Sequence, residues 1–396
     1  MDGTTVLGTA TVSGTLARIT GLNLRIPRNT TRNLVVEVST HAGLTAPRFV
    51  AVSVVGAGAI DARDPEGLDV SVTANVNPLP NPARIVTVQT AGTLTAAISP
   101  ATPVAGLVAV GNVGVRNVAV TTVRYTAVRE PIILEEITVS TTAVGENFTS
   151  VEIFDGTTVI ASMPMPAGVN PNAVFTGLNI EIPTTGHRDL VFRANLNSIG
   201  NGATSGHIVE LDVDVIRARG RNSGTPVPDT ANIIGGNALT IRQSVPTVAK
   251  LANQTVLTNA NDEVLRFTVA ADSRGDVELR TLIATFNRVL HTTEARTIRL
   301  FEGATEIATA SVTAGTTTGT FSITGRTERF IAAGASRTFT VRADSYGTAA
   351  LFAEIRTDAM DGAVGNLVWR DGSATATDIN GHLVPGLPVT GDTLRQ

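Results

Sequence analysis

The sequence repeats itself at intervals of about 150 residues, and this constrains the fold more than any other feature. Short segments inside 151–195 recur on both sides of it, at offsets of about 147 to 156 residues. The matched pairs are 2–6 with 155–159, 19–27 with 175–183, 298–303 with 151–156, and 339–344 with 190–195. Solenoid and propeller repeats are far shorter, at roughly 20 to 50 residues. Each repeat is therefore predicted to be a whole domain, and the chain a tandem array.

The repeat divides the 396 residues into an incomplete first copy, 1–90, and two complete copies, 91–243 and 244–396. A domain of about 150 residues buries enough surface to fold without cross-links, and the chain has no cysteine. The linkers between copies are Thr90-Ala91-Gly92 and Ser244-Val245-Pro246, and neither contains a Gly/Ser-rich or Pro-rich tract. Such short linkers predict a semi-rigid, extended array.

Segments rich in Val, Thr and Ile, bounded by Gly, Pro and Asn, predict strands almost throughout. In the first copy these segments are 4–13, 17–24, 32–39, 48–55 and 84–89. Alternation at 50–54 and 209–215 indicates antiparallel sheets with one buried face. Arg124 and Arg266 should face outward, and Tyr125 and Phe267 inward, while a helical turn is expected only near 292–296. The predicted fold class is all-β, with immunoglobulin-like antiparallel β-sandwiches in tandem.

The first copy is predicted to be incomplete. In the repeat alignment, Met1 falls at a hairpin turn in the middle of a domain, and the equivalent of 93–154 is missing. A sandwich without those strands exposes an apolar face and an unpaired edge. Two alternatives stay open: the chain is a fragment of a longer protein, or strands from another copy complete the domain. Residues 1–90 should fold only when the strands are supplied, whereas 91–396 should fold unaided.

Three motifs follow one another in the second copy: a hairpin Val-Glu-Ile-Phe-Asp-Gly at 151–156, Gly-Leu-Asn-Ile-Glu-Ile-Pro at 177–183, and a strand Leu-Val-Phe-Arg-Ala-Asn at 190–195. This order resembles the immunoglobulin-like repeats of large bacterial cell-surface proteins, including S-layer-type and stalk proteins. The resemblance covers essentially the whole chain. Its motifs are turn and strand signatures, so it implies extracellular scaffolding rather than a reaction.

No pattern in the sequence indicates catalysis. The five histidines lack zinc-ligand spacing, and neither a G-x-S-x-G elbow nor a phosphate-binding loop occurs. Glu135 and Glu136 are adjacent in a predicted strand, so they should point to opposite faces. A net charge of −4 and 4% aromatic residues argue against nucleic-acid binding. We predict no catalytic, cofactor-binding or metal-ligating residue and do not expect an enzyme.

Calcium is the alternative to an absence of cofactors. Two loops in corresponding regions of the first and third copies carry the oxygen ligands that calcium prefers: Asp61, Asp64, Glu66 and Asp69, and Asp358, Asp361 and Asp371. The second copy has Arg217, Arg219 and Arg221 there, so solvated loops are the favoured interpretation. Three Asn-x-Thr sequons, at Asn29, Asn147 and Asn253, permit glycosylation.

The sequence favours a structural protein of the cell surface that self-associates into a filament, sheath or S-layer. The expected partners are other copies of the chain, or upstream domains of the same chain. Neither end carries a targeting segment, and no apolar run is long enough to span a membrane. The alternatives are an adhesin or glycan-binding stalk, and an accessory array of a larger secreted enzyme. Trp369 and Tyr346 are the candidates for an exposed glycan platform.

Overall fold

The computed structural model describes residues 2–39, 48–52, 60–70, 85–88, 92–228, 233–258, 260–289, 295–344, 350–355, 367–373, 377–380 and 383–395. The chain forms two compact units, Met1–Gly92 with Asn222–Thr225, and Thr93–Arg221 with Pro226–Gln396. We call 2–92 the N-terminal segment, 93–243 the middle segment and 244–395 the C-terminal segment. Within the described residues the only helical element is a 3₁₀ turn, Gly145–Asn147. The prediction of an all-β protein is confirmed.

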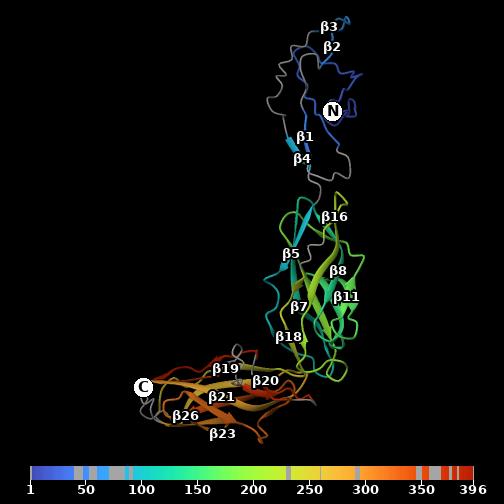
Figure 1. Cartoon of the computed structure of the whole chain (residues 1–396). Helices are drawn as coiled ribbons and strands as arrows, with labels where there is room; N and C mark the ends of the chain where they lie inside the picture. The colour runs from blue at the N-terminus through green and yellow to red at the C-terminus, as the bar shows by residue number, and fades with distance from the viewer. Residues whose placement is uncertain are drawn as a thin grey trace. The chain divides into compact units, whose positions relative to one another are not determined.

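The middle segment contains two large sheets, drawn in cyan to yellow-green in Figure 1. The first has the order β10 (Thr158–Pro164), β9 (Phe148–Asp155), β13 (Arg188–Leu196), β7 (Val115–Val128) and β5 (Thr93–Ile98). The second has the order β11 (Asn172–Phe175), β8 (Ile132–Ser140), β15 (Asp212–Gly220) and β16 (Pro226–Val227), with β12 (Ile180–Ile182) on β8 and β17 (Ile234–Gly235) on β15. A small sheet joins β14 (Ile208–Val209), β18 (Leu239–Arg242) and β6 (Gly106–Ala109).

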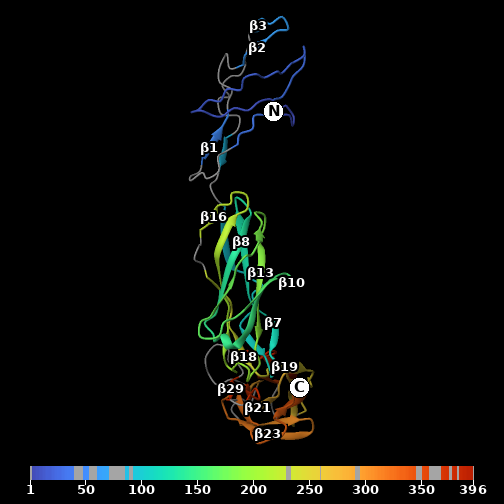
Figure 2. The ribbon, with the colours of Figure 1, turned by 90° about the vertical axis from the view of Figure 1, so that its right-hand side faces the viewer.

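The core of the middle segment lies between its two large sheets. Tyr125 and Phe192 come from the first sheet, Ile137 and Phe175 come from the second, and all four belong to one buried cluster. Arg124 is half-buried beside fully buried Tyr125, as the alternation predicts. Figure 2 shows β8 and β13, one strand from each sheet, running along the same body. The segment is therefore a two-layer β-sandwich.

The C-terminal segment has its own pair of large sheets. The first has the order β19 (Pro246–Leu251), β20 (Asp262–Ala271), β26 (Ser336–Ala343), β22 (Arg296–Glu302) and β23 (Thr305–Val312). The second has the order β29 (Ile379–Asn380), β28 (Leu367–Arg370), β21 (Val277–Val289), β27 (Ala350–Ile355) and β30 (Val389–Thr390), with β24 (Thr318–Ser322) and β25 (Phe330–Ile331) on β21 and β31 (Leu394–Arg395) on β27. Phe267 faces inward as predicted and stacks on Phe339, with ring centroids 5.7 Å apart.

The two five-stranded sheets share one strand order, and the ladder between their third and fifth strands has the same register. Both run first, second, fifth, third, fourth in the sequence of their own strands. Arg193 lies opposite Glu152 between β13 and β9, and Arg342 lies opposite Arg299 between β26 and β22. These are the positions that the sequence repeat matches. Related sequences in the two segments therefore form the same pairings.

The N-terminal segment departs from the prediction. Its strands are β1 (Arg48–Ala51), β2 (Ala62–Arg63), β3 (Asp69–Val70) and β4 (Ile85–Val88). Those predicted at 4–13, 17–24 and 32–39 do not form; 2–39 contains only isolated bridges, between Asp2 and Leu34, Asp2 and Thr5, and Ser13 and Leu16. A strand needs a neighbour for its backbone groups, and in the middle segment the matching residues pair with β7, β8 and β9.

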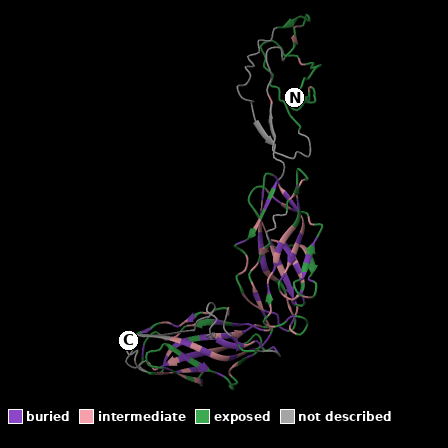
Figure 3. Ribbon diagram, viewed as in Figure 1, coloured by how far each residue is buried: buried purple, intermediate pink, exposed green. Residues whose placement is uncertain are grey.

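The remaining predicted elements of these regions lie only partly within the described residues. The segments 48–55 and 84–89 are strands at 48–51 and 85–88, and 53–55, 84 and 89 lie outside the described residues. Of the predicted helical turn, 295 precedes β22 and 296 begins it, while 292–294 lie outside the described residues. Figure 3 shows 2–39 and 60–70 almost entirely exposed, in contrast to the buried strands of the other two segments.

Candidate functional site

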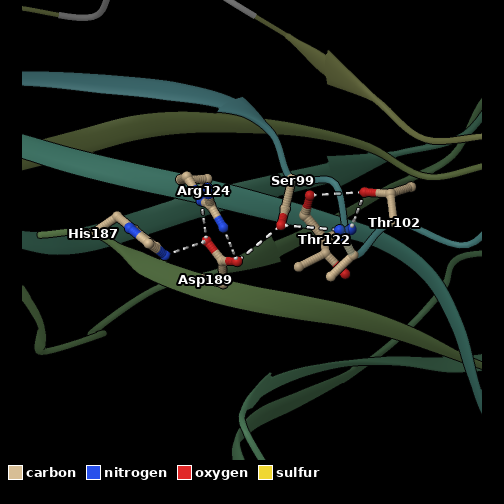
Figure 4. A network of polar contacts seen from close by, with 7 residues as sticks. Ser99, Thr102, Thr122, Arg124, His187 and Asp189 are labelled. Atoms are coloured by element: carbon tan, nitrogen blue, oxygen red, sulfur yellow. Dashed lines mark hydrogen bonds and ion pairs between the residues drawn. The ribbon is translucent and has the colours of Figure 1, made fainter.

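The polar network of the middle segment shown in Figure 4 surrounds Asp189 on β13. Arg124 on β7 donates two hydrogen bonds to this carboxylate, from Nε to Oδ1 at 2.8 Å and from Nη2 to Oδ2 at 2.9 Å. Ser99 Oγ donates to Oδ2 at 2.8 Å, and His187 Nε2 lies 3.9 Å from Oδ1. The carboxylate thus joins β13 and β7 to the turn that follows β5.

The same network fixes that turn through hydroxyl groups. Ser99 Oγ accepts the Ala101 amide at 3.2 Å. Thr102 Oγ1 donates to the Thr122 carbonyl at 3.0 Å and accepts the Thr122 amide at 3.1 Å. The ladder of backbone hydrogen bonds between β5 and β7 ends with β5. Beyond it, these contacts keep the turn attached to β7.

The Asp189 network contains serine, histidine and aspartate but is not arranged for nucleophilic catalysis. A catalytic serine donates to the base that removes its proton, whereas Ser99 donates directly to the carboxylate. The Arg124 hydrogen bonds hold the pKa of Asp189 below its ordinary value, against the opposing effect of burial. A carboxylate with a lowered pKa is a weak base. The network is therefore suited to tying strands together.

Glu135 and Glu136 lie on the same side of β8, so the prediction that they point to opposite faces is wrong. The β8–β15 ladder pairs Arg217 with Glu136 and then Ala218 with Leu134, skipping Glu135. This β-bulge suspends the alternation of side chains. Arg217 then contacts both carboxylates, at 3.3 and 3.5 Å, and Arg219 Nε donates to Glu135 at 2.7 Å. The pair is held by arginines and offers no free acid and base.

In the acidic loop of the N-terminal segment, the three aspartates contact other groups of the protein. Asp64 Oδ1 accepts the Leu68 amide at 2.8 Å and closes the turn. The ion pairs are Asp61 with Arg18 at 3.3 Å and Asp69 with Arg63 at 3.0 Å. Within the described part of the chain, no group of three or more histidine, aspartate or glutamate side chains is placed to hold a metal ion. Asp358 and Asp361 lie outside the described residues.

Asp371, the third member of that acidic set, is fully buried where the middle and C-terminal segments meet. Its Oδ2 accepts hydrogen bonds from the Ser205 hydroxyl and from the Gln243 amide, the latter at 2.9 Å. Its Oδ1 accepts from the amide of Ser373 at 3.2 Å and from the Ser373 hydroxyl at 2.7 Å. Arg242 Nη1 donates to Ser205 Oγ at 3.3 Å, so a cation backs the network. We call this contact the joint.

Close packing accompanies the Asp371 contact at the boundary of the two segments. Gly111 of the middle segment, at a φ of 56°, has no room for a side chain, because a Cβ there would lie 2.5 Å from Arg274 Cβ. Within the C-terminal segment, Ser244 Oγ donates to the Gly275 carbonyl at 2.6 Å in a buried position. Leu107 on β6 packs against the core of the C-terminal segment. Polar and apolar contacts together therefore bind the two segments.

The electrostatics of the joint favour a charged carboxylate. Burial raises the pKa of Asp371, but the hydrogen bonds from Ser205, Gln243 and Ser373 outweigh it and hold the pKa below its ordinary value. Burial lowers the pKa of Arg242, and the negative charge of Asp371 opposes that effect. The carboxylate thus stabilises the charged form of the guanidinium.

One ion pair occurs at the same sequence position in all three segments. It joins the acidic residue of the Phe-Asp-Gly-type motif to an arginine at the position where β13 and β26 begin in the two complete sandwiches. The pairs are Asp2 with Arg32, Asp155 with Arg188 at 2.6 Å, and Glu302 with Arg337 at 3.1 Å. These pairs were not predicted from the sequence, although an arginine at equivalent positions of the three copies was the available signal.

Two surface predictions are corrected by burial. Trp369, proposed as an exposed glycan platform, is fully buried in the core of the C-terminal segment, because the apolar run Leu367–Trp369 of β28 packs inside the sandwich. Tyr346 lies outside the described residues. Asn147 is also fully buried, so its sequon is closed in the folded protein, whereas Asn29 is exposed.

No family model matches the chain, and no curated protein matches it. Among solved structures, a serine-rich repeat adhesion glycoprotein from Streptococcus agalactiae shares 11% sequence identity, over 76% of this chain and 96% of that chain, at a TM-score of 0.19. A fucolectin from striped bass (Morone saxatilis) serum shares 11% identity, over 64% and 95%, at a TM-score of 0.15. Likenesses this low support no conclusion about fold or function. Among the described residues, no helix is long and apolar enough to cross a membrane.

Proposed function

We propose that this chain is a non-enzymatic structural protein of the cell exterior, built from immunoglobulin-like sandwiches in tandem. Its copies would self-associate into a filament, sheath or S-layer. The function is mechanical: each sandwich holds its neighbour at a fixed position, and polar networks such as those of Asp189 and Asp371 tie the strands and segments together.

The strand order supports the immunoglobulin-like assignment. Immunoglobulin domains place strands in the order A-B-E-D in one sheet and pair C with F in the other. The middle segment has β5-β7-β13-β9 in its first sheet and the pair β8–β15 in its second. The C-terminal segment has β19-β20-β26-β22 and pairs β21 with β27 and β28. The hairpin strands β10 and β23 extend the first sheets beyond this pattern.

The joint carries the proposal of a structural role. A flexible spacer needs a polar, unstructured linker, whereas here Gln243, the residue before the boundary, donates its amide to a buried carboxylate of the next segment. Gly111 packs without a gap against Arg274. Such a contact transmits force and orientation from one sandwich to the next, which suits a scaffold.

The alternative of a glycan-binding stalk has lost its principal candidate, because the only tryptophan is buried. Sugar-binding platforms need an exposed aromatic face. The described networks also hold their carboxylates in contact with arginines or amides, which favours fixed structure over a ligand site.

Self-association is tested by sedimentation velocity and negative-stain electron microscopy across a concentration series. We expect ordered assemblies from the full chain above a threshold concentration. The Asp371→Ala variant should still associate but lose long-range order, because its joint no longer fixes the segments. Asp276→Ala is the matched control, since this exposed carboxylate accepts the Ala333 amide within one segment. Separate, monodisperse particles at every concentration would contradict the proposal.

A further inference from the structure

A set of large apolar side chains in the N-terminal segment is exposed to solvent. Its members are Ile19, Ile26, Leu34, Val36 and Val38, which are between 39 and 58% exposed. The last three alternate along the chain, as they would on one face of a strand, and Val35 between them is exposed as well. We call these five residues the apolar stripe. Exposed groups of large apolar side chains of this kind mark interaction surfaces.

The matching positions of the middle segment are in the core. The sequence repeat aligns the apolar stripe with Phe175, Ile182, Leu190, Phe192 and Ala194, which are at most 1% exposed. Related sequences thus occupy opposite environments in one chain. The difference lies in what covers them, because the apolar character is the same.

The N-terminal segment nevertheless keeps the local geometry of the complete sandwich. Asp2 bridges both Leu34 and Thr5, as Asp155 pairs with Leu190 and Thr158 in the middle segment. Gly3 and Gly156, the next residues, both have a φ of 58°. Arg32 binds Asp2 as Arg188 binds Asp155. The turn and its registration with the following stretch are therefore in place before any covering strand is added.

Named strands cover these positions in the middle segment. Leu190 and Phe192 lie between β7 and β9, with Phe192 opposite Thr121 on one side and Ile153 on the other. Phe175 and Ile182 pair with β8. All three strands belong to 93–155.

We propose that the apolar stripe is an acceptor face for a polypeptide segment of the same sequence type as 93–154, which would place its strands where β7, β8 and β9 lie in the middle segment. The occupant is a set of antiparallel strands with alternating Val, Ile and Thr, bound by ladder hydrogen bonds and by burial of the stripe. This inference holds whether the array is a scaffold or an adhesin, so it does not depend on the proposed function.

Strands fit this face better than a second apolar stripe does. Two stripes packed face to face would cover side chains without extending a ladder. The middle segment shows both kinds of contact at once, since Phe192 is buried and its strand pairs on both edges. The retained bridge from Asp2 to Leu34 marks one of those edges.

The test adds the occupant to the full chain. A copy of 93–154 is fused directly before Asp2, at the point where the repeat alignment joins Phe154 to Asp155. Hydrogen exchange is followed at Leu34–Val38, with Leu190–Ala194 as the internal reference. In the parent chain we expect exchange at Leu34–Val38 to be about 100-fold or more faster than at the reference, and in the fused chain within about 10-fold of it.

Two variants of the fused chain serve as controls. Replacing the copied Val123, Tyr125 and Ile137 by aspartate, or changing Val36→Asp in the acceptor, should abolish the gain in protection while leaving Leu190–Ala194 protected. No gain in the unmodified fused chain would overturn the proposal. So would protection of Leu34–Val38 in the parent chain that appears only with dimerisation in sedimentation while 93–154 stays in its own sandwich, because the apolar stripe of a second copy would then be the occupant.

Discussion

Removing the Asp371 carboxylate is predicted to weaken the C-terminal segment and to detach it from the middle segment. In Asp371→Ala, the Ser205 hydroxyl and the Gln243 amide lose their acceptor in a buried place. The two hydrogen bonds from Ser373 are lost as well. Arg242 loses the charge that opposes its desolvation.

The expected loss in the free energy of unfolding follows from the two hydrogen bonds that cross the joint. A hydrogen bond to a charged group contributes about 1.5–3 kcal/mol, so losing both costs about 3–6 kcal/mol. Removing one member of a buried charged network costs about 3–5 kcal/mol in other proteins. For Asp371→Ala we therefore expect the free energy of unfolding to fall by about 3–5 kcal/mol. Asp371→Asn keeps one acceptor oxygen and should lose about half as much.

Trp369 supplies the assay. It is the only tryptophan in the chain, is fully buried, and lies two residues from Asp371. Urea unfolding followed by its fluorescence reports the C-terminal segment alone. Asp276→Ala, the control within one segment, should cost less than about 1 kcal/mol because its carboxylate is exposed. An Asp371→Ala midpoint equal to that of the control would refute the reasoning.

The stability contributed by Asp371 should fall at acid pH. The pKa of Asp371 is lowered in the folded protein, so the stabilisation is complete above the unfolded-state value of about 3.9 and is lost as pH falls through the lower folded value. The wild type should therefore lose stability relative to Asp371→Asn below about pH 4. Unfolding curves of the two proteins between neutral pH and pH 3 give this difference, and parallel pH profiles would contradict it.

Three further predictions concern single side chains. Tyr125→Phe should stabilise the middle segment by about 1 kcal/mol in thermal unfolding, because its hydroxyl is buried without a hydrogen-bond partner; a clear loss would reveal a hidden partner. Arg188→Ala and Arg337→Ala should each cost less than about 1 kcal/mol, because their ion pairs are partly exposed; a larger urea-midpoint shift would oppose this. In a glycosylating host, mass spectrometry should find glycan at Asn29 and none at buried Asn147.

Patterns that depend on local chemistry were predictable from the sequence. Alternation placed Tyr125 and Phe267 in the core, because successive side chains of a strand point to opposite faces. The repeat alignment matched 298–303 with 151–156, and the structure pairs those residues in the same register. The all-β class followed from composition and turn signals.

Features that depend on distant partners were not predictable. The bulge at Glu135 is set by the ladder with β15, so no local pattern reveals that both carboxylates face one side. The segments 4–13 and 32–39 have the composition of strands, but within the described residues they form only isolated bridges and no ladder with a neighbour. Asp371 was grouped with calcium ligands, since its contact with Ser205 joins residues 166 positions apart. Trp369 lies in a continuous apolar run, which does not distinguish an exposed ring from a buried one.

The central claim is that the middle and C-terminal segments move as one body. The chain has no cysteine, so Ser162→Cys on β10 and Thr309→Cys on β23 give two unique, exposed sites for spin labels. Pulsed electron–electron double resonance then measures the distribution of distances between them. We predict a single narrow distribution in the otherwise wild-type chain and a broad one after Asp371→Ala. A broad distribution with Asp371 intact would contradict the account.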